Sequence, residues 1–288
     1  MIFKFYKILL ISIIAIIVLI FLSLGFFWFS YQPKNQLEVD FLDVGQGDAI
    51  LIKVTTGQNI LIDGGPDQKI IKRLGENLSW WDKQIDLMIL THPHDDHVSG
   101  LINVLKRYDV KEIVYSGVVC NSPNYLAWLK LVQEKKIKLT IIDRPQTVKL
   151  SDNCRLEMIY PQKSLLGQEV ENLNNSSIAI RLVYGKTKFL FVGDLEELSE
   201  KELLNSKVDL TADVLKVGHH GSDTSSSQLF LEKIKPRLAI ISVGLKNDFG
   251  HPSLRIIKRL ERLGVKVLRT DKSGTIKLIS NQSGLVNF

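Results

Sequence analysis

The sequence predicts an α/β fold in which two mixed sheets pack together with helices on the outside, preceded by one N-terminal membrane helix. Three observations support this prediction. Strand patterns joined by tight turns, followed by strand–helix units, occur twice along the chain. The 288 residues are 45% hydrophobic and 24% charged, which fits a globular protein with a large core and excludes a disordered chain. Residues 8–30 carry no charge.

The first predicted element is the membrane helix, the 23 uncharged residues 8–30, which are mostly Ile, Leu and Phe. At about 1.5 Å per residue it spans about 35 Å, enough to cross a hydrocarbon core of about 30 Å. Lys4 and Lys7 precede it, which places residues 1–7 in the cytoplasm and the rest of the chain outside. We therefore expect a single-pass cell-membrane protein with an extracytoplasmic domain. A cleaved signal peptide is the alternative, although its apolar region is typically shorter.

A short linker over residues 31–36 is predicted to lead into a single domain over residues 37–288. The first half of this domain opens with apolar strands separated by turn residues and continues with strand–helix units. The expected strands are Leu37–Leu42, Ala49–Val54, Asn59–Ile62, Ile85–Leu90, Glu112–Tyr115 and Leu139–Ile142, and the expected helices are Val98–Arg107 and Pro123–Glu134.

The second half repeats this order, because the pattern becomes strand-rich again after a loop that contains Pro145. Helical spacing then alternates with short apolar runs until the end of the chain. The expected strands are Arg155–Ile159, Ile178–Tyr184, Lys188–Val192, Val214–Val217, Leu238–Val243, Val265–Arg269 and Thr275–Ser280, and the expected helices are Glu196–Leu204, Ser226–Ile234 and Leu254–Leu263.

All six histidines lie in short motifs, and most of these follow apolar strands. Three fall in the segment His92-Pro93-His94-Asp95-Asp96-His97, and the others are His219, His220 and His251. A rigid sheet holds side chains firmly at its strand ends, where metal ligands are expected. Neutral imidazole and carboxylate together suit zinc, manganese or iron. We expect His92 and His94 to bind one ion, and Asp96 and His97, where the chain turns into a helix, to bind a second.

This motif, His92-x-His94-x-Asp96-His97, resembles the signature of the metallo-β-lactamase superfamily. The resemblance implies a four-layer αββα sandwich with one or two divalent ions, Zn²⁺ or Mn²⁺, between the sheet edges. It further implies that Asp194 bridges both ions, that Asp63 orients the metal loop, and that the last ligand comes from His219 or His220. We favour His220, because many members carry this ligand directly before a glycine, with His219 then facing the substrate. The other assignment stays open.

Three further segments resemble the metallo-hydrolase domain of the ComEC competence DNA-uptake proteins. They are Phe41–Ala49, Leu215–Ser222, and Ser242–Gly244 followed by Gly250–Pro252. The resemblance implies catalytic roles for Asp96, His219 and His251. It also implies that residues around the ligands support them, namely Asp43, Asp48, Asp63, Asn175 and Ser176.

The chain also departs from these families. Many superfamily members supply a third histidine to the first metal, but no histidine lies between His97 and His219. The corresponding segment, Asn172–Ser177, offers only oxygen donors, so an oxygen ligand or a water has to complete that site. Oxygen-rich coordination favours manganese over zinc. Full ComEC proteins carry a multi-span channel, and this chain, with one predicted span, cannot be that channel.

The motifs predict a hydrolase that uses a metal-activated water. The subfamily resemblance favours phosphodiesters, and DNA as the substrate, within a DNA-uptake machinery. Arg255, Arg259 and Arg262 fall at i, i+4 and i+7 of a predicted helix and are expected to follow a phosphate backbone. Residues 31–288 carry 35 Lys and Arg (37 minus Lys4 and Lys7) against 31 acids, a net charge of +4, which is only mildly basic.

Two alternatives stay open at this point. One is a phosphoesterase or lactonase-like hydrolase that acts on a substrate other than nucleic acid. The other is an anchored DNA-binding module that is catalytically weak because a ligand is missing. The sequence gives no oligomeric state, and it leaves open whether Cys120 and Cys154 form a disulfide.

Overall fold

A computed structural model of the chain describes residues 2–30 and 36–286, which fall into two units, Met1–Asn35 and Gln36–Phe288. The first unit contains helix α1 (Ile2–Ser30), which covers the segment predicted to cross a membrane. Over the described residues, no helix is both long and apolar enough to span a membrane, so the anchor stays a prediction. Most of the predicted linker, residues 31–35, lies outside the described residues.

The second unit begins with an eight-stranded mixed sheet. Its strands run in the order β15-β14-β1-β2-β3-β4-β5-β6. β1 (Leu37–Phe41), β2 (Ile50–Lys53) and β3 (Asn59–Ile62) form an antiparallel meander, and β4 (Gln84–Ile89), β5 (Asp109–Tyr115) and β6 (Lys138–Ile141) then add in parallel. The chain ends with β14 (Ile276–Asn281) and β15 (Gly284–Leu285), which pair beside β1.

The other sheet has seven strands in the order β13-β12-β11-β10-β9-β8-β7. β7 (Gln146–Ser151), β8 (Cys154–Tyr160), β9 (Ala179–Tyr184) and β10 (Thr187–Phe191) are antiparallel, and β11 (Val214–Lys216), β12 (Leu238–Ile241) and β13 (Lys266–Arg269) continue in parallel. Both halves thus pass from hairpins to parallel units, as the sequence predicts. The histidine motifs follow the C-terminal ends of two parallel strands, β4 in the first sheet and β11 in the second.

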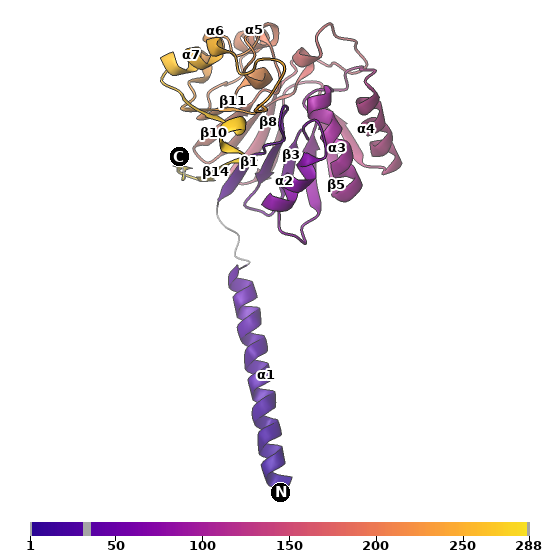
Figure 1. The fold of residues 1–288 in the computed structure, drawn as a ribbon, viewed down its shortest axis with the longest axis vertical. Coiled ribbons are helices and arrows are strands. Elements are labelled where there is room, and N and C mark those ends of the chain that lie inside the picture. The colour runs from indigo at the N-terminus through magenta and orange to yellow at the C-terminus, as the bar shows by residue number, and fades with distance from the viewer. Residues whose placement is uncertain (1, 31–35, 287–288) are drawn as a thin grey trace. The chain divides into compact units, whose positions relative to one another are not determined.

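Helices cover the outer faces of both sheets, which gives four layers (Figure 1). On the first sheet lie α2 (Lys69–Asn77), α3 (Asp95–Arg107) and α4 (Pro123–Glu134), and on the second lie α5 (Glu197–Asn205), α6 (Gln228–Ile234) and α7 (Leu254–Arg262). Apolar side chains between the helices and each sheet form two buried clusters, and a third cluster lies between the two sheets. In the third cluster, Phe41 contacts Phe191 at 6.0 Å between ring centroids. Burying a side chain of this size stabilises the fold by about 1.5–3 kcal/mol.

The observed elements differ from the predicted ones in a few places, each with a physical reason. α2 was not predicted because only Ile70 and Leu74 of its residues are buried, too few for a clear helical period. β7 is mostly exposed and carries only two apolar residues, Val148 and Leu150, too few to indicate a strand. The short helix α8 (Thr270–Ser273) has a single buried residue. Cys120 and Cys154 are both free, which settles the disulfide question that the sequence left open.

Candidate metal centre

The histidine-rich segment forms the connection from β4 to α3. His92 is buried just beyond the end of β4, and His94, with extended backbone, is the residue before α3. Asp96 and His97 therefore lie in the first helical turn, where the positive end of the helix dipole favours carboxylates. Gly47 keeps this turn in place, because a Cβ there would lie 2.2 Å from the Asp96 carbonyl oxygen.

Two loops of the second sheet bring further donors to the same point. Asp194 follows β10 and is held by its backbone N–H, which donates to Ser177 Oγ at 3.0 Å. His219 and His220 follow β11, both in left-handed backbone at φ 48° and 52°. Such values cost a non-glycine residue about 1–3 kcal/mol and gather at functional sites. The strained turn aims His220 at Asp194, whereas His219 points elsewhere.

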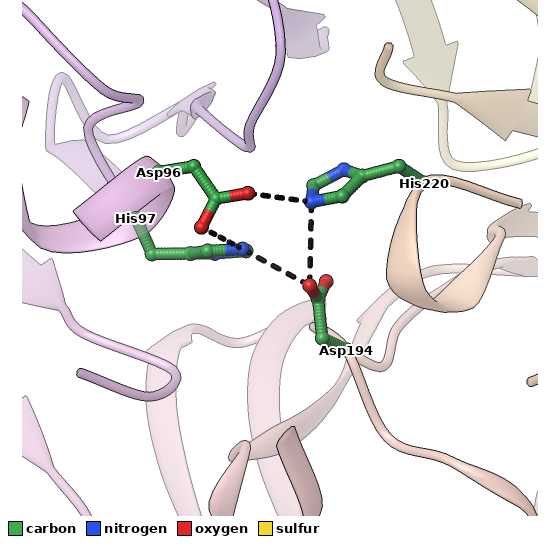
Figure 2. Close-up of side chains that lie close together, drawn as sticks. All are labelled: Asp96, His97, Asp194 and His220. Carbon is green, nitrogen blue, oxygen red and sulfur yellow. Dashed lines mark hydrogen bonds and ion pairs between the residues drawn. The ribbon is translucent and has the colours of Figure 1, made fainter. Parts of the chain in front are cut away.

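Four side chains, Asp96, His97, Asp194 and His220, form what we call the four-donor cluster (Figure 2). Nε2 of His220 lies 3.1 Å from Asp96 Oδ2 and 3.2 Å from Asp194 Oδ2. Nε2 of His97 lies 3.3 Å from the same Asp194 oxygen and 3.9 Å from Asp96 Oδ1. Two separate sheets thus contribute to one cluster.

The cluster fits a divalent ion. Donors about 2.0–2.2 Å from a tetrahedral ion lie about 3.3–3.6 Å from one another, close to the distances observed here. Among the described residues, buried Asp194 Oδ1 has no hydrogen-bond partner, and the polar contacts of buried His97 Nε2 are those with the Asp194 and Asp96 carboxylates. Buried polar atoms without a partner are costly, and an ion bound between them removes this cost.

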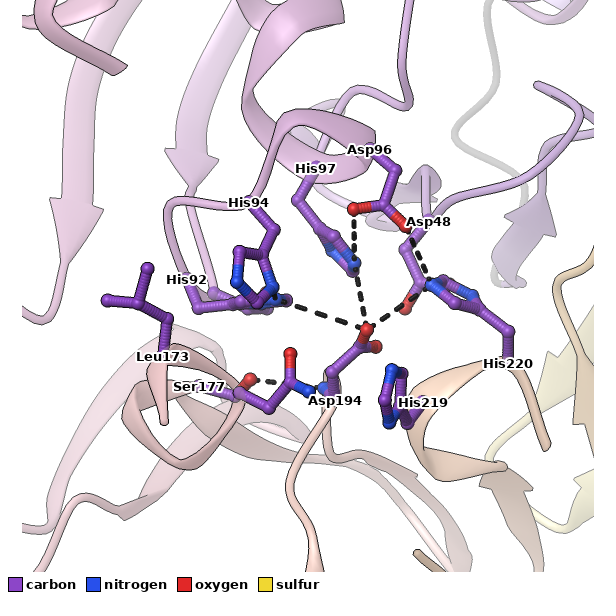
Figure 3. Close-up of polar contacts among 12 residues, drawn as sticks. Asp48, His92, His94, Asp96, His97, Leu173, Ser177, Asp194, His219 and His220 are labelled. Atoms are coloured by element: carbon purple, nitrogen blue, oxygen red, sulfur yellow. Dashed lines mark hydrogen bonds and ion pairs between the residues drawn. The ribbon is translucent and has the colours of Figure 1, made fainter. Parts of the chain in front are cut away.

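His92 and His94, which we call the histidine pair, lie on the other side of Asp194 (Figure 3). His92 Nε2 lies 3.0 Å from His94 Nδ1 and 3.9 Å from Asp194 Oδ2. In place of a third histidine, the segment after residue 172 forms a 3₁₀ turn, Leu173–Ser176. Leu173 lines the same cleft as His94, so the chain supplies fewer donors on this side.

Asp63 supports ligands on both sides of Asp194. Its Oδ2 accepts from His97 Nδ1 at 2.8 Å and from the Thr91 hydroxyl at 2.7 Å, and Thr91 Oγ1 in turn lies 3.2 Å from His92 Nδ1. These contacts place the ring protons on Nδ1 and leave Nε2 of both rings for an ion. Asp63 is itself left-handed, at φ 58°. Thr91 was not predicted as a site residue, although its place between an apolar strand and His92 indicates a position next to the ligands.

His220 has a support of its own. Its Nδ1 donates to the Ser242 carbonyl at 3.0 Å and lies 3.4 Å from Asp48 Oδ1. Asp48 is in turn paired at 2.6 Å with Lys216, and both side chains are buried. Lys216 was not predicted to support the site, although a lysine inside the apolar strand Val214–Val217 is unusual enough to indicate a buried partner.

The buried carboxylates of the site favour a bound cation. Burial alone would lower the pKa of His97 and of His220, but carboxylates around them, Asp194 foremost, raise it well above the ordinary value. Burial and the charge of His97 instead lower the pKa of His92 well below its usual range. Neutral imidazole is the form that binds metal, so His92 is ready for an ion. Protons on the rings of His97 and His220 offset the negative charge of the carboxylates, and a bound ion would take over this role.

The remaining predicted residues lie at various distances from the cluster. His219 and His251 line the cleft without joining the cluster, and their ring centroids are 5.5 Å apart. Asp43 instead binds Arg73 and the Gly45 N–H. Asn175 Oδ1 accepts from Glu196 N and Ser199 Oγ, and Ser176 donates to the Leu173 carbonyl. Asp43 and Asn175 thus contact neighbouring helices and loops, and Ser176 bonds within its own turn, so their support of the ligands stays a prediction.

The arginines of α7 do not form one face toward a ligand. Arg255 and Arg262 are exposed and line a shallow depression apart from the cleft, together with Lys258 and Glu261. Arg259 is buried and donates to the Ser226 carbonyl. The prediction that Arg259 contacts DNA is therefore wrong, because its guanidinium holds the loop after His220 against α7.

The geometry agrees with a comparison against known families. The family model described as the metallo-beta-lactamase superfamily matches residues 42–244. The chain belongs to this superfamily. Its members share the four-layer sandwich seen here and bind one or two divalent ions at the site that the histidine motif forms. Solved structures agree on the fold: YhfI from Bacillus subtilis aligns with TM-score 0.54 at 12% identity over 86% of this chain and all of that one. CmlA from Streptomyces venezuelae aligns with TM-score 0.55 at 14% identity, over 84% of this chain and 54% of that one.

Relatives in sequence include competence proteins. ComE operon protein 3 of Bacillus subtilis (strain 168) is 31% identical over 85% of this chain and 33% of its own length. Competence protein ComA of Neisseria gonorrhoeae is 28% identical over 88% of this chain and 34% of its own. Recombination protein 2 of Haemophilus influenzae is 29% identical over 87% of this chain and 30% of its own. The chain thus spans about a third of the length of these relatives, and it resembles ComEC-type proteins across that third.

Proposed function

We propose that this metal-dependent hydrolase is a phosphodiesterase that cuts DNA, anchored in the cell membrane with its catalytic domain outside the cytoplasm. The observation that carries the proposal is the four-donor cluster with the histidine pair beside it, joined by Asp194 at the floor of a cleft of about 650 Å³. Similarity to competence and recombination proteins supports DNA as the substrate.

The ligand set suits Zn²⁺ or Mn²⁺, which would be held by Asp96, His97, Asp194 and His220 on one side and by His92, His94 and Asp194 on the other. A divalent ion supplies Lewis-acid chemistry and lowers the pKa of the water it binds toward neutrality. Around it, the chain contributes His219 and His251, which line the cleft. Both rings have a pKa lowered first of all by burial. We assign their neutral rings, each of which keeps one N–H donor, to orient phosphoryl oxygens. Proton donation to the leaving oxygen would need the protonated ring, which burial disfavours.

One observation favours a second candidate, a hydrolase of a substrate other than nucleic acid. The described residues that line the cleft include no Lys or Arg, and several are apolar, such as Pro123 and Leu173. A DNA backbone would therefore meet positive charge only beyond the cleft, for instance at Arg255 and Arg262, which we propose as the DNA path on α7.

The anchor is a proposal that rests on the sequence. Residues 8–30 are uncharged, Lys4 and Lys7 precede them, and α1 continues as one helix over Ile2–Ser30. We propose residues 1–7 as cytoplasmic, 31–36 as the linker, and 37–288 as the extracytoplasmic hydrolase that works beside a DNA-uptake machinery. The full chain should then sediment with membranes, and protease added to intact cells should digest the domain. Protection from that protease would contradict the orientation.

The test of the activity is to incubate the full-length protein with linear DNA and with bis-p-nitrophenyl phosphate. Mn²⁺, Zn²⁺ or a chelator is added, and Asp194→Asn serves as the inactive control. We expect metal-dependent cutting of both substrates, absent in the variant. Turnover of the small diester without cutting of DNA would favour the second candidate. DNA binding without cutting in either metal would mean a binding module that is catalytically weak.

A further inference from the structure

Phe249 is an exposed aromatic side chain that lines the cleft. Its side chain is 69% exposed, and it lines the same cleft as Asp96, Asp194 and His220. Single exposed apolar residues are common on protein surfaces. Phe249 differs from such residues because hydrogen bonds fix the loop that carries it.

Polar contacts, rather than burial of Phe249, fix this loop. The Asn247 side-chain amide donates to the carbonyls of Gly244 at 3.0 Å and His251 at 2.8 Å, and its oxygen accepts from His251 N–H at 2.9 Å. Gly244 N–H donates to Gln46 Oε1 at 3.2 Å. The loop therefore keeps its shape while Phe249 stays in solvent.

The ring of Phe249 is also the outer member of an aromatic stack that leads to the metal ligands. It lies nearly parallel to the His251 ring, at 16° and 5.8 Å between centroids. His251 meets the edge of His219 at 5.5 Å, and His219 precedes His220 of the four-donor cluster. One face of Phe249 is thus used by His251, and the exposed remainder offers a π-surface to whatever enters the cleft.

We infer that Phe249 is a stacking platform for an unpaired nucleobase beside the phosphodiester at the metal cluster, so that the site takes single-stranded in preference to duplex DNA. This inference rests on the proposed phosphodiesterase function. Stacking on an aromatic ring is available to every base and needs no sequence readout. A base in a duplex must first be unpaired and unstacked. No Lys or Arg is among the described residues that line the cleft, so stacking on Phe249 would add affinity that charge does not supply there.

The experiment measures binding of a short, phosphorothioate-linked oligonucleotide to the metal-loaded, full-length protein by fluorescence anisotropy. We expect Phe249→Ala to weaken binding of the single strand by roughly 5- to 150-fold. Phe249→Trp should keep wild-type affinity, and Phe249→Leu should behave like Phe249→Ala, because it keeps the apolar bulk without the π-surface. On a strand whose central nucleotides are abasic, wild type and Phe249→Ala should bind equally. A duplex of the same sequence should bind the wild type more weakly.

Leu245→Ala is the matched control, since Leu245 is 75% exposed in the same loop and does not line the cleft; it should bind like the wild type. Thermal melting checks that each variant is folded. If Phe249→Ala binds the single strand as the wild type does, or loses equally on the abasic strand, the stacking inference is wrong while the proposed activity stands. If the wild type neither binds nor cuts DNA, both are wrong.

Discussion

The two sides of the metal centre differ in how many donors the fold supplies and in how firmly those donors are held. The four-donor cluster draws on both sheets, and its histidines are each braced by a buried carboxylate, His97 by Asp63 and His220 by Asp48. Among the described residues, the ion-pair contact of the histidine pair is with Asp194, at 3.9 Å from His92. Where many superfamily members add a histidine, this chain has the turn Leu173–Ser176.

We therefore expect the one motif to encode two sites of unequal strength. His92 and His94 precede α3, whereas Asp96 and His97 lie within its first turn, where the helix fixes their direction. Metal affinity depends on ligand number and on the groups that orient the ligands. We therefore expect one tightly bound ion at the four-donor cluster and one weakly bound ion at the histidine pair.

The largest effect is expected at Asp194, which both sides share. Asp194→Asn removes the charged oxygen that lies 3.3 Å from His97 Nε2 and 3.2 Å from His220 Nε2. We predict that the variant binds neither ion and has no measurable turnover, as judged by metal analysis and hydrolysis of bis-p-nitrophenyl phosphate. Asp43→Asn is the matched control, because Asp43 contacts no ligand, and it should keep wild-type metal content. Retention of one ion by Asp194→Asn would contradict the assignment of Asp194 as a donor to both sites.

The next effect concerns the support of His220. Lys216→Met leaves the buried carboxylate of Asp48 without its partner at 2.6 Å. Removing one member of a buried pair typically costs 3–5 kcal/mol, and we predict a loss of about that size in the free energy of unfolding, measured in urea. Adding Asp48→Asn should recover part of it, because the unpaired charge is gone. An unchanged unfolding free energy in the single variant would show that the Lys216–Asp48 pair adds no stability to the fold that holds His220.

A smaller effect is expected at Asp63, which contacts His97 and Thr91 and lies outside the four-donor cluster. Asp63→Asn suits the test because asparagine tolerates the left-handed backbone at this position. Loss of an orienting carboxylate typically lowers metal affinity by 10–100-fold. We predict a decrease of this order in a competition titration with a fluorescent chelator. Wild-type affinity would mean that the rings are held by packing alone.

The smallest effect is expected at the exposed arginines of α7, which do not line the cleft. If Arg255 and Arg262 contact DNA phosphates, replacing both by Ala should flatten the dependence of log affinity on log salt by about 1.4 units on a single strand. Arg259→Ala should leave the slope unchanged and lower stability instead, because this side chain is buried against Ser226. An unchanged slope in the double variant would remove α7 from the DNA path.

Much of this arrangement could be predicted from the sequence. The two rounds of hairpins and strand–helix units follow from apolar periodicity, and the strand ends carry His92, Asp194 and His220 because a turn must follow each buried strand. The motif spacing also implied that two pairs of donors face two ions. These features are local, so a pattern along the chain can report them.

The rest depends on contacts between segments far apart in the chain. Nothing local indicates that His219 and His220 adopt left-handed backbone, which is what directs His220 rather than His219 into the cluster. Helical spacing alone predicted Arg259 on the same face as its neighbours, but packing against the loop at Ser226 buries it. Lys216 finds its partner 168 positions away in sequence, at Asp48, and no periodicity reports such a pair.

The most direct test of the unequal-site account is a calorimetric titration of the metal-free, full-length protein with Mn²⁺ and with Zn²⁺, in parallel for the wild type, His94→Ala and His97→Ala. We predict two sites of distinct affinity in the wild type. His94→Ala should lose only the weak site and keep the tight one, and His97→Ala should lose the tight one. Two equal sites in the wild type, or loss of the tight site in His94→Ala, would contradict the account.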